Sequence, residues 1–525
     1  MLCFLRRCWA STSSGVGQAA MILAGASVVS RVLGVVRDRL LAATFGAGWE
    51  LDAYYAAFRL PDTLYNLVIL GALSAGFLPI YTELRAKEGA TKAYAFAGTV
   101  LRWVAMICAL GGVVGAFLAP SLVPLVARGF SQDRLDLAVQ LTRILFLSPI
   151  FLGMSAIVGG VLQTAKRTLV FAVAPIWYNL GILLGITVGA RFFGMMGVAI
   201  GVVIGAFFHM TTQVVVARQE GVKLRGSLAW TPDMTRLLRL TFPRLAALGA
   251  SQGSLLVTMG FASTLSVGSV AVWQLGNNLQ SFPLGVIGIS FAIAAFPLLS
   301  EAAGSKNVVA YHETLERAGR KILFFLVPIS LLLILLRAQF VRLILGDGAF
   351  DWSATIATAE VVGWMSVSLV AQAMIPLLAR AFYAIQSTWT PFLVTVIAES
   401  TNILVAWYAY QRYGVRGLAM AFTVAAIVQM TLLWICLRQR AGAAFEQGLL
   451  HMLGFALVAS VPALMLAWGA RQVVGTIFPL SQFWQVALQL AAAFGVASLA
   501  YLATMYAFGQ REAEELVARI RRFLP

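Results

Sequence analysis

Several charged residues lie inside an otherwise apolar segment near the start of the chain. The segment SRVLGVVRDRLLAATFGAG carries Arg31, Arg37, Asp38 and Arg39. A charged side chain at the centre of a bilayer costs about 2.5–3.5 kcal/mol, so such residues normally face a wet cavity or a partner of opposite charge. Arg31 has apolar sequence on both sides, which predicts a cavity position. Arg39 is more typical of a side chain that reaches the membrane surface.

A second charged group follows in the segment ELDAYYAAFRLPD. Asp52 and Arg59 are seven residues apart there, and residues at that spacing share a helix face. Guanidinium groups bind phosphate through parallel hydrogen bonds and keep their charge when partly desolvated. The arginines of the two segments therefore predict a binding site for a phosphorylated lipid or another bulky anion. For Arg244, which follows Pro243 inside a long apolar segment, a place in this site and a place elsewhere both remain open.

Composition indicates the elements that must position these residues. The chain has 525 residues, of which 60% are hydrophobic and 11% are charged. Soluble globular proteins carry about 25% charged residues, so most of this surface faces lipid. Apolar runs of roughly twenty residues recur along the chain and predict about fourteen transmembrane helices. The polar and apolar alternation of a membrane β-barrel is absent, so the predicted fold is an all-α integral membrane protein.

The two halves of the chain share short motifs at a constant spacing. FPLLSE, with Pro297, follows FLPIYTE, with Pro79, and GVRGLAMA, with Gly417, follows GMMGVAIG, with Gly197, each about 220 residues later. Glycine and proline punctuate all transporters, so a single match could arise by chance. Together the matches predict two parallel six-helix lobes with pseudo-two-fold symmetry and a substrate cavity between them.

The repeat divides the chain into five expected parts. They are a cytoplasmic N-terminal tail, an N-lobe, a C-lobe, two extra C-terminal helices and a cytoplasmic amphipathic tail, with the bounds 1–17, 18–217, 232–440, 447–508 and 509–525. In the last part, Leu516, Ile520 and Phe523 form one stripe of a helix. Such a helix either lies in the membrane interface or is a solvated charged helix.

The net charge of +17 arises from 38 Lys and Arg against 21 Asp and Glu. In a soluble protein this excess would indicate nucleic-acid binding. In a membrane protein it reflects topology, because basic residues gather in short cytoplasmic loops. Their distribution here predicts that both termini are cytoplasmic, and we expect no nucleic-acid partner.

Nothing in the sequence resembles an enzyme site. The three histidines are scattered, the four cysteines have no paired or metal-ligand spacing, and no glycine-rich loop precedes a lysine at P-loop spacing. We therefore expect no enzyme activity, no metal and no cofactor, and transport driven by the membrane potential or an ion gradient. The acids Glu360 and Glu399 are more typical of satisfied cavity or interface residues than of an ion site.

Longer motifs resemble a known family along most of the chain. They are SRVLGVVRD, FGAGWELDAYYAAFRLP, APIWYNLGIL, FPLGVIGISFAIAAFPLLS and RAFYAIQSTWTP. With these motifs the chain resembles the MurJ (MviN) lipid II flippases of the multidrug/oligosaccharidyl-lipid/polysaccharide exporter superfamily. The resemblance implies a bacterial inner-membrane protein with a cationic central cavity that opens alternately to each side. It also implies that the last two helices form a groove for the polyprenyl tail.

Individual site residues follow from this resemblance. Arg31 and Arg37 would hold the pyrophosphate of the lipid-linked substrate, and Asp52 would pair with an arginine or help to gate. Several positions depart from the family pattern. Asn278 stands where an arginine is common, Ser387 stands where an acid is common, and Tyr65, Asn66 and Leu70 stand in a stretch where basic residues and a Glu are common. The cavity would then hold fewer positive charges, with Arg59 or Arg244 compensating, and the second lobe would lack the acid of a cation site.

Three alternatives to a lipid II flippase remain open at this point. A flippase for another polyprenyl-linked glycan, such as an O-antigen unit, would bind the same pyrophosphate group. A multidrug antiporter of the same superfamily would carry acids rather than arginines in its cavity. A membrane glycosyltransferase or polymerase would need exposed acids or a long external loop. For a flippase we expect a monomer, with cell-wall synthesis proteins as candidate contacts.

Overall fold

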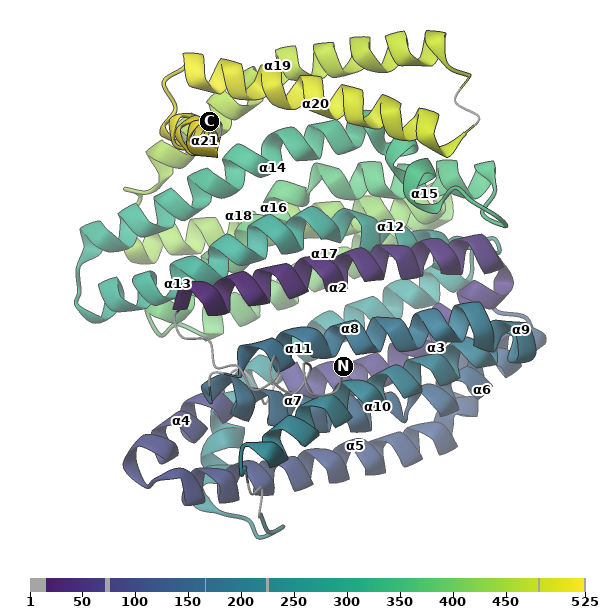
Figure 1. Cartoon of the computed structure of the whole chain (residues 1–525), viewed down its shortest axis with the longest axis vertical. Helices are drawn as coiled ribbons and strands as arrows, with labels where there is room; N and C mark the ends of the chain where they lie inside the picture. The colour runs from purple at the N-terminus through teal and green to yellow at the C-terminus, as the bar shows by residue number, and fades with distance from the viewer. Residues whose placement is uncertain (1–15, 71–75, 166, 223–225, 480–481, 524–525) are drawn as a thin grey trace. The chain divides into compact units, whose positions relative to one another are not determined.

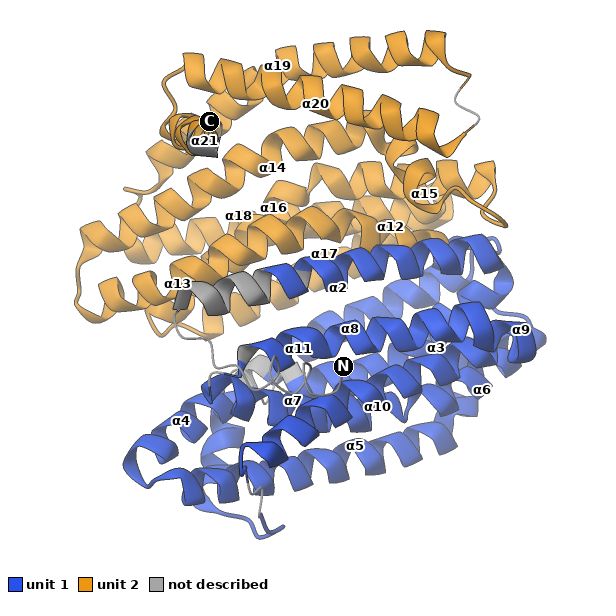
Figure 2. Cartoon of the chain, in the orientation of Figure 1, with its two compact units in different colours: residues 1–271 blue, residues 272–525 orange. Residues whose placement is uncertain are grey.

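The protein is described here by a computed structural model, which covers residues 16–70, 76–165, 167–222, 226–479 and 482–523. Some side chains in these ranges lie outside the description, namely those of residues 16–24, 27, 70, 168, 243, 244, 522 and 523. All regular elements in the described ranges are helices, which confirms the all-α prediction. The chain divides into two compact units, residues 1–271 and residues 272–525 (Figure 2).

In the first unit, long helices lie side by side and are joined by short turns (Figure 1). The helix α2 packs against α8, and α10 packs against α8 and α7. The elements are α2 Val16–Phe45, α3 Trp49–Tyr65, η1 Asn66–Leu70, α4 Leu78–Lys87, α5 Ala90–Val126, α6 Gln132–Leu145, α7 Ser148–Thr164, α8 Thr168–Leu184, η3 Gly185–Gly189, α9 Ala190–Phe193, α10 Met195–Gln219 and α11 Pro232–Ser263.

In the second unit, α14 packs against α13, α15, α16 and α19, so it forms the centre of the helix bundle. The pairs α17 with α18 and α19 with α20 also pack closely. The elements are α12 Ser269–Pro283, which begins at the end of the first unit, η4 Leu284–Gly288, α13 Ile289–Gly304, α14 Val308–Leu345, α15 Trp352–Val367, α16 Leu369–Ala384, α17 Trp389–Tyr413, α18 Val415–Ala441, α19 Glu446–Ile477, α20 Phe483–Ala507 and α21 Arg511–Phe523.

Eleven helical segments of the described residues are long and apolar enough to cross a membrane, or twelve if the bent pair α15 and α16 forms one span. The chain is therefore a multi-pass membrane protein. The first two expected spans are not among these segments. The first corresponds to α2, which carries four charged residues, and the second is divided by η1 and by residues 71–75, outside the description. The count of fourteen stays a prediction.

The elements recur along the chain at the spacing of the sequence motifs. The long helix α5 of the first unit and α14 of the second begin about 220 residues apart, as do the π-helical turns η1 and η4. The turn glycines agree as well: Gly194 before α10 has φ 55° and ψ −139°, and Gly414 before α18 has φ 58° and ψ −139°. The recurring element order supports an internal duplication.

The unit boundary and the predicted lobe boundary differ by one helix. The helix α11 belongs to the first compact unit, whereas the repeat placed residues 232–440 in the second lobe. The compact units are defined by how the helices pack, whereas the predicted lobes are defined by repeated sequence motifs. The predicted lobes, the two-helix groove and the tails therefore remain predictions.

Glycines line the contact between α8 with η3 and α10. The two antiparallel rows are Gly181, Gly185 and Gly189 on one side and Gly197, Gly201 and Gly205 on the other. A Cβ atom at Gly201 would lie 2.6 Å from the carbonyl oxygen of Gly181 and 2.6 Å from the Cα atom of Gly185. Small residues at every fourth position allow membrane helices to approach to backbone contact. This contact fixes α8, which carries part of the site described next.

Candidate functional site

The charged residues of α2 form an ion pair. The Nε and Nη2 atoms of Arg37 donate to the same oxygen of Asp38, at 2.9 Å and 2.8 Å. Asp38 is buried, with 5% of its surface exposed, while 25% of the Arg37 side chain is exposed. Because a guanidinium has five N–H donors, this pairing leaves three of them for other acceptors. Arg37 can therefore hold Asp38 and a further anion together.

The helix α3 adds a second charged pair beside the first. Arg59 and Asp62 interact electrostatically, and Asp62 also interacts with Arg37. Residues three apart on a helix are neighbours, which explains how one face of α3 carries both groups. Arg37 and Arg59 thus each interact with an aspartate, Arg37 with Asp38 and Arg59 with Asp62.

Tyrosines surround the charged cluster. Tyr54 and Tyr55 of α3 and Tyr178 of α8 all interact electrostatically with Arg37 or Asp62. Tyr54 is 3% exposed and Tyr55 is 8% exposed, with their ring centroids 5.5 Å apart in an edge arrangement. Within the described residues the Tyr55 hydroxyl is buried and makes no hydrogen bond. It is a donor that a bound ligand could satisfy.

A polar contact fixes α2 on α8 close to Arg31. The side-chain amide of Asn179 donates to the backbone oxygen of Ser30 at 3.2 Å and to its hydroxyl at 3.3 Å. Arg31, the next residue, is half-buried, and no hydrogen bond or ion pair of Arg31 occurs among the described residues. The hydrogen bonds fix the neighbouring residue Ser30 on α8, while the predicted role of Arg31 in phosphate binding stays a prediction.

Asp52 is hydrogen-bonded to backbone groups and also interacts electrostatically with Arg134. One carboxylate oxygen accepts from the N–H of Gly268 at 2.6 Å, and the other accepts from the N–H of Ala271 at 2.8 Å. Asp52 is 1% exposed and lies in the first turn of α3. It satisfies backbone donors at the start of α12, as a helix cap does. This geometry gives Asp52 an anchoring role, while the pairing with an arginine or the part in gating that the resemblance implied stays a prediction.

The two remaining candidates are Arg244 and Asn278. Arg244 lies in α11, but its side chain is outside the description. Asn278 lies in α12 within the second unit, where its side-chain oxygen accepts from Gln274 at 2.8 Å. The structure therefore brings together Arg37 and Arg59 from the predicted set, with Asp52 at the start of the same helix as Arg59.

Acids of the second unit are engaged within that unit. Glu360 of α15 forms an ion pair with Arg416 of α18. Glu399 lines a pocket of 210 Å³ between α16, α17 and α18, together with the amides of Gln372, Asn402 and Gln429. Where the family commonly has an acid, the Ser387 hydroxyl accepts a hydrogen bond from Arg440 at 2.7 Å. The residue at this position is therefore a serine that binds an arginine of the same unit.

Sequence reasoning missed four members of the cluster, namely Asp62, Tyr54, Tyr55 and Tyr178. Asp62 could have been found from its spacing, since it follows Arg59 by three residues and shares its helix face. The three tyrosines carried no such signal, because aromatic residues inside apolar helices usually serve as packing. Their positions depend on how α3 and α8 pack, which the sequence does not reveal.

The fold defines the class of protein. It is shared with the solved structure of a lipid II flippase MurJ in an inward closed conformation, at a TM-score of 0.74 and 24% identity over 93% of this chain and 98% of that one. An inward-facing multidrug-resistance MATE transporter of the MOP superfamily matches at a TM-score of 0.70 and 15% identity, over 79% of this chain and 95% of that one. The protein has the fold of MOP-superfamily membrane transporters.

Sequence comparison then gives the family. The profile of the family described as lipid II flippase MurJ matches residues 41–488. A probable lipid II flippase MurJ from Rhizobium tropici is 28% identical over 446 residues, or 83% of each chain. One from Thermotoga maritima is 28% identical over 451 residues, covering 86% of this chain and 90% of the relative. The chain belongs to the lipid II flippase MurJ family, as its motifs predicted.

Proposed function

We propose that this protein translocates lipid II, the undecaprenyl-pyrophosphate-linked precursor of peptidoglycan, from the cytoplasmic to the outer leaflet of a bacterial inner membrane by alternating access. The observation that carries the proposal is the Arg37 guanidinium, which is held by Asp38 through two nitrogens and keeps further donors for an anion. Its setting in a chain of the MurJ family supports a pyrophosphate as that anion.

The paired charges supply a physical mechanism for binding and release. In the empty state Asp38 and Asp62 neutralise the arginines, which avoids leaving an unpaired charge in a region of low dielectric constant. A pyrophosphate would take up the remaining Arg37 donors, with Arg59, Arg31 and the Tyr55 hydroxyl as further candidate ligands. The polyprenyl tail would stay in lipid, so the charged headgroup alone would cross inside the protein.

Several further properties belong to the same proposal. Both termini would be cytoplasmic, in line with the distribution of basic residues. The energy would come from the membrane potential or an ion gradient, with no cofactor and no chemical step. The protein would act as a monomer, with cell-wall synthesis proteins as candidate contacts. The family membership favours this function over a multidrug antiporter and over a glycosyltransferase.

Complementation tests the proposal directly. A bacterial strain whose own lipid II flippase is depleted would express this chain, and lipid II in each leaflet would be measured by a probe that reaches only the outer face. We expect growth and outer-leaflet lipid II to be restored. Persistent accumulation in the inner leaflet, with the protein present in the membrane at normal amounts, would refute the proposal.

A second strain separates lipid II from other polyprenyl-linked glycans. Depletion of an O-antigen flippase leaves peptidoglycan synthesis intact and blocks only the other glycan. Expression of this chain should leave that block in place. Rescue of the O-antigen strain without rescue of the lipid II strain would assign the cargo to the other class.

A further inference from the structure

The last helix of the chain begins where a membrane-spanning helix ends. The helix α20 is one of the candidate spans, and only three residues separate its end at Ala507 from the start of α21 at Arg511. In Figure 1, α20 is seen lengthwise and α21 is seen end on, so the two helices cross steeply. A helix that starts beside a span and runs across it lies along the membrane surface.

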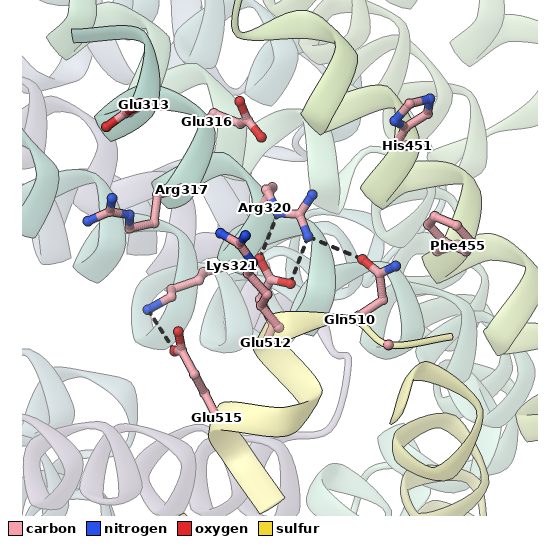
Figure 3. Close-up of a pocket in the computed structure, with 12 residues that line it drawn as sticks. Glu313, Glu316, Arg317, Arg320, Lys321, His451, Phe455, Gln510, Glu512 and Glu515 are labelled. Atoms are coloured by element: carbon pink, nitrogen blue, oxygen red, sulfur yellow. Dashed lines mark hydrogen bonds and ion pairs between the residues drawn. The ribbon is translucent and has the colours of Figure 1, made fainter. Parts of the chain in front are cut away.

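A polar pocket beside α21 indicates the level of this helix relative to the membrane. The pocket has a volume of 620 Å³ and lies between α14, α19 and the beginning of α21 (Figure 3). Charged side chains make up most of its lining, namely Glu313, Glu316, Arg317, Arg320, Lys321, Arg511, Glu512 and Glu515. So many charges are incompatible with the hydrocarbon region. The pocket therefore lies at the level of water and lipid headgroups, and α21 forms one of its walls.

The acidic first half of α21 binds to α14 within the second unit. Arg320 of α14 donates to both oxygens of Glu512, at 2.8 Å and 2.9 Å, and to the side chain of Gln510 at 3.1 Å (Figure 3). Lys321 forms an ion pair with Glu515 at 3.4 Å. These contacts hold the first two turns of α21 on α14.

The second half of α21 carries a different surface. Along its apolar stripe, Ala513 is fully buried and Leu516 packs against the core, but Ile520 is 44% exposed. Arg519 and Arg521 flank Ile520, and both are exposed. No hydrogen bond or ion pair of these two arginines occurs within the described residues. Among the described residues the stripe is therefore buried at Ala513, partly buried at Leu516 and exposed at Ile520.

We propose that the second half of α21 docks on the surface of a bilayer that contains anionic phospholipids. Ile520 would enter the boundary between headgroups and acyl chains, and Arg519 and Arg521 would contact lipid phosphates. Interfacial helices lie parallel to the membrane and carry apolar residues beside basic ones, as the second half of α21 does. The basic charge selects anionic over neutral lipids. The proposal depends on α20 spanning the membrane and not on the cargo of the transporter.

Hydrogen exchange on the full-length protein tests this docking. The protein would be placed in nanodiscs of phosphatidylcholine, with or without phosphatidylglycerol, and exchange would be followed in peptides covering α21. We expect exchange in the second half of α21 to slow by about fivefold or more when the anionic lipid is present. The effect should shrink at high salt, because salt screens exposed charges.

Variants separate lipid docking from folding. Arg519→Gln with Arg521→Gln should abolish the dependence on anionic lipid, whereas Arg191→Gln with Arg412→Gln, which removes the same charge from exposed sites elsewhere, should preserve it. Ile520→Ser should speed exchange of α21 in both lipids. Unchanged exchange in α19 and α20 checks that each variant is folded. Equal exchange in both lipids for the unaltered protein, or a lipid dependence that survives loss of both arginines, would overturn the proposal.

Discussion

Asp52 and Gly268 are far apart in the sequence, yet the carboxylate of Asp52 accepts a hydrogen bond of 2.6 Å from the backbone N–H of Gly268. The other carboxylate oxygen binds the N–H of Ala271. One buried side chain therefore connects the start of α3 to the start of α12. Its removal would leave two backbone donors without an acceptor.

The first prediction concerns Asp52→Asn. The amide offers one acceptor oxygen in place of two, so one N–H loses its partner, at a cost of about 1–3 kcal/mol. We expect a lower melting temperature in detergent, measured by intrinsic fluorescence, and reduced transport in proportion to the folded fraction. Loss of transport at an unchanged melting temperature would instead assign Asp52 to the substrate or to gating.

The second prediction separates two roles of Arg37. Arg37→Ala should abolish lipid II transport and also destabilise the protein by about 1.5–3 kcal/mol, because it removes hydrogen bonds to a buried carboxylate. The double variant Arg37→Ala with Asp38→Asn should recover much of the stability, since no buried charge is left behind, but not the transport. Transport and melting temperature would be measured on the same preparations.

Recovery of transport in that double variant would make Arg37 a structural residue only. Arg31→Ala provides the comparison, because Arg31 has no hydrogen bond or ion pair among the described contacts. We expect it to lose transport with little change in melting temperature. Full transport in both Arg31→Ala and Arg37→Ala would remove the phosphate-binding role from α2.

The third prediction concerns the glycine contact of α8 and α10. In Gly201→Ala the new methyl group would lie 2.6 Å from backbone atoms of Gly181 and Gly185, so the helices must separate. We expect a cost of about 1–3 kcal/mol, read as a lower melting temperature. Gly249→Ala in α11 is the matched control, because no atom lies within 4 Å of its added methyl group. Equal melting temperatures for the two variants would contradict the close packing.

The fourth prediction concerns pH and the contact of α4 with α11. Lys87 and Arg236 both bind Glu83, at 2.8 Å each, and lower the pKa of this carboxyl group to about 2. Because folding lowers the pKa of Glu83, its ion pairs stabilise the protein at pH values above the ordinary pKa of a glutamate. This stabilisation is lost as the pH falls toward about 2. Glu83→Gln should therefore lower the melting temperature slightly at pH 7. The difference from the unaltered protein should vanish on acidification, and a constant difference would exclude this ion pair as its cause.

Much of the fold could be predicted because the bilayer imposes simple rules. A span needs a long apolar helix, so hydrophobic runs locate most helices directly. The predicted duplication rests on motifs that keep their spacing, such as those of Gly197 and Gly417, and the turn glycines Gly194 and Gly414 before the same helices share one backbone conformation. The end of α3 at Tyr65 was harder to predict, because η1 has the apolar sequence NLVIL and continues the hydrophobic run.

The site was predicted less completely, for reasons that differ between residues. Charge inside an apolar helix drew attention to Arg37 and Arg59, because a charge inside a membrane is costly, and their part in substrate binding stays a prediction. The partners of Asp52 could not be predicted, because nearly every residue has a backbone N–H and residue type does not show which ones bind a side chain. Neighbours on a helix seldom face each other, so the pairing of Arg37 with Asp38 also depended on the long reach of the arginine side chain.

The glycine contact of α8 and α10 has a consequence for movement. Interfaces built from side chains can slip when rotamers change, but here main chain touches main chain, and no rotamer exists to absorb a displacement. We expect α8 and α10 to move together as one rigid body during the transport cycle. The conformational change would then take place at other helix contacts.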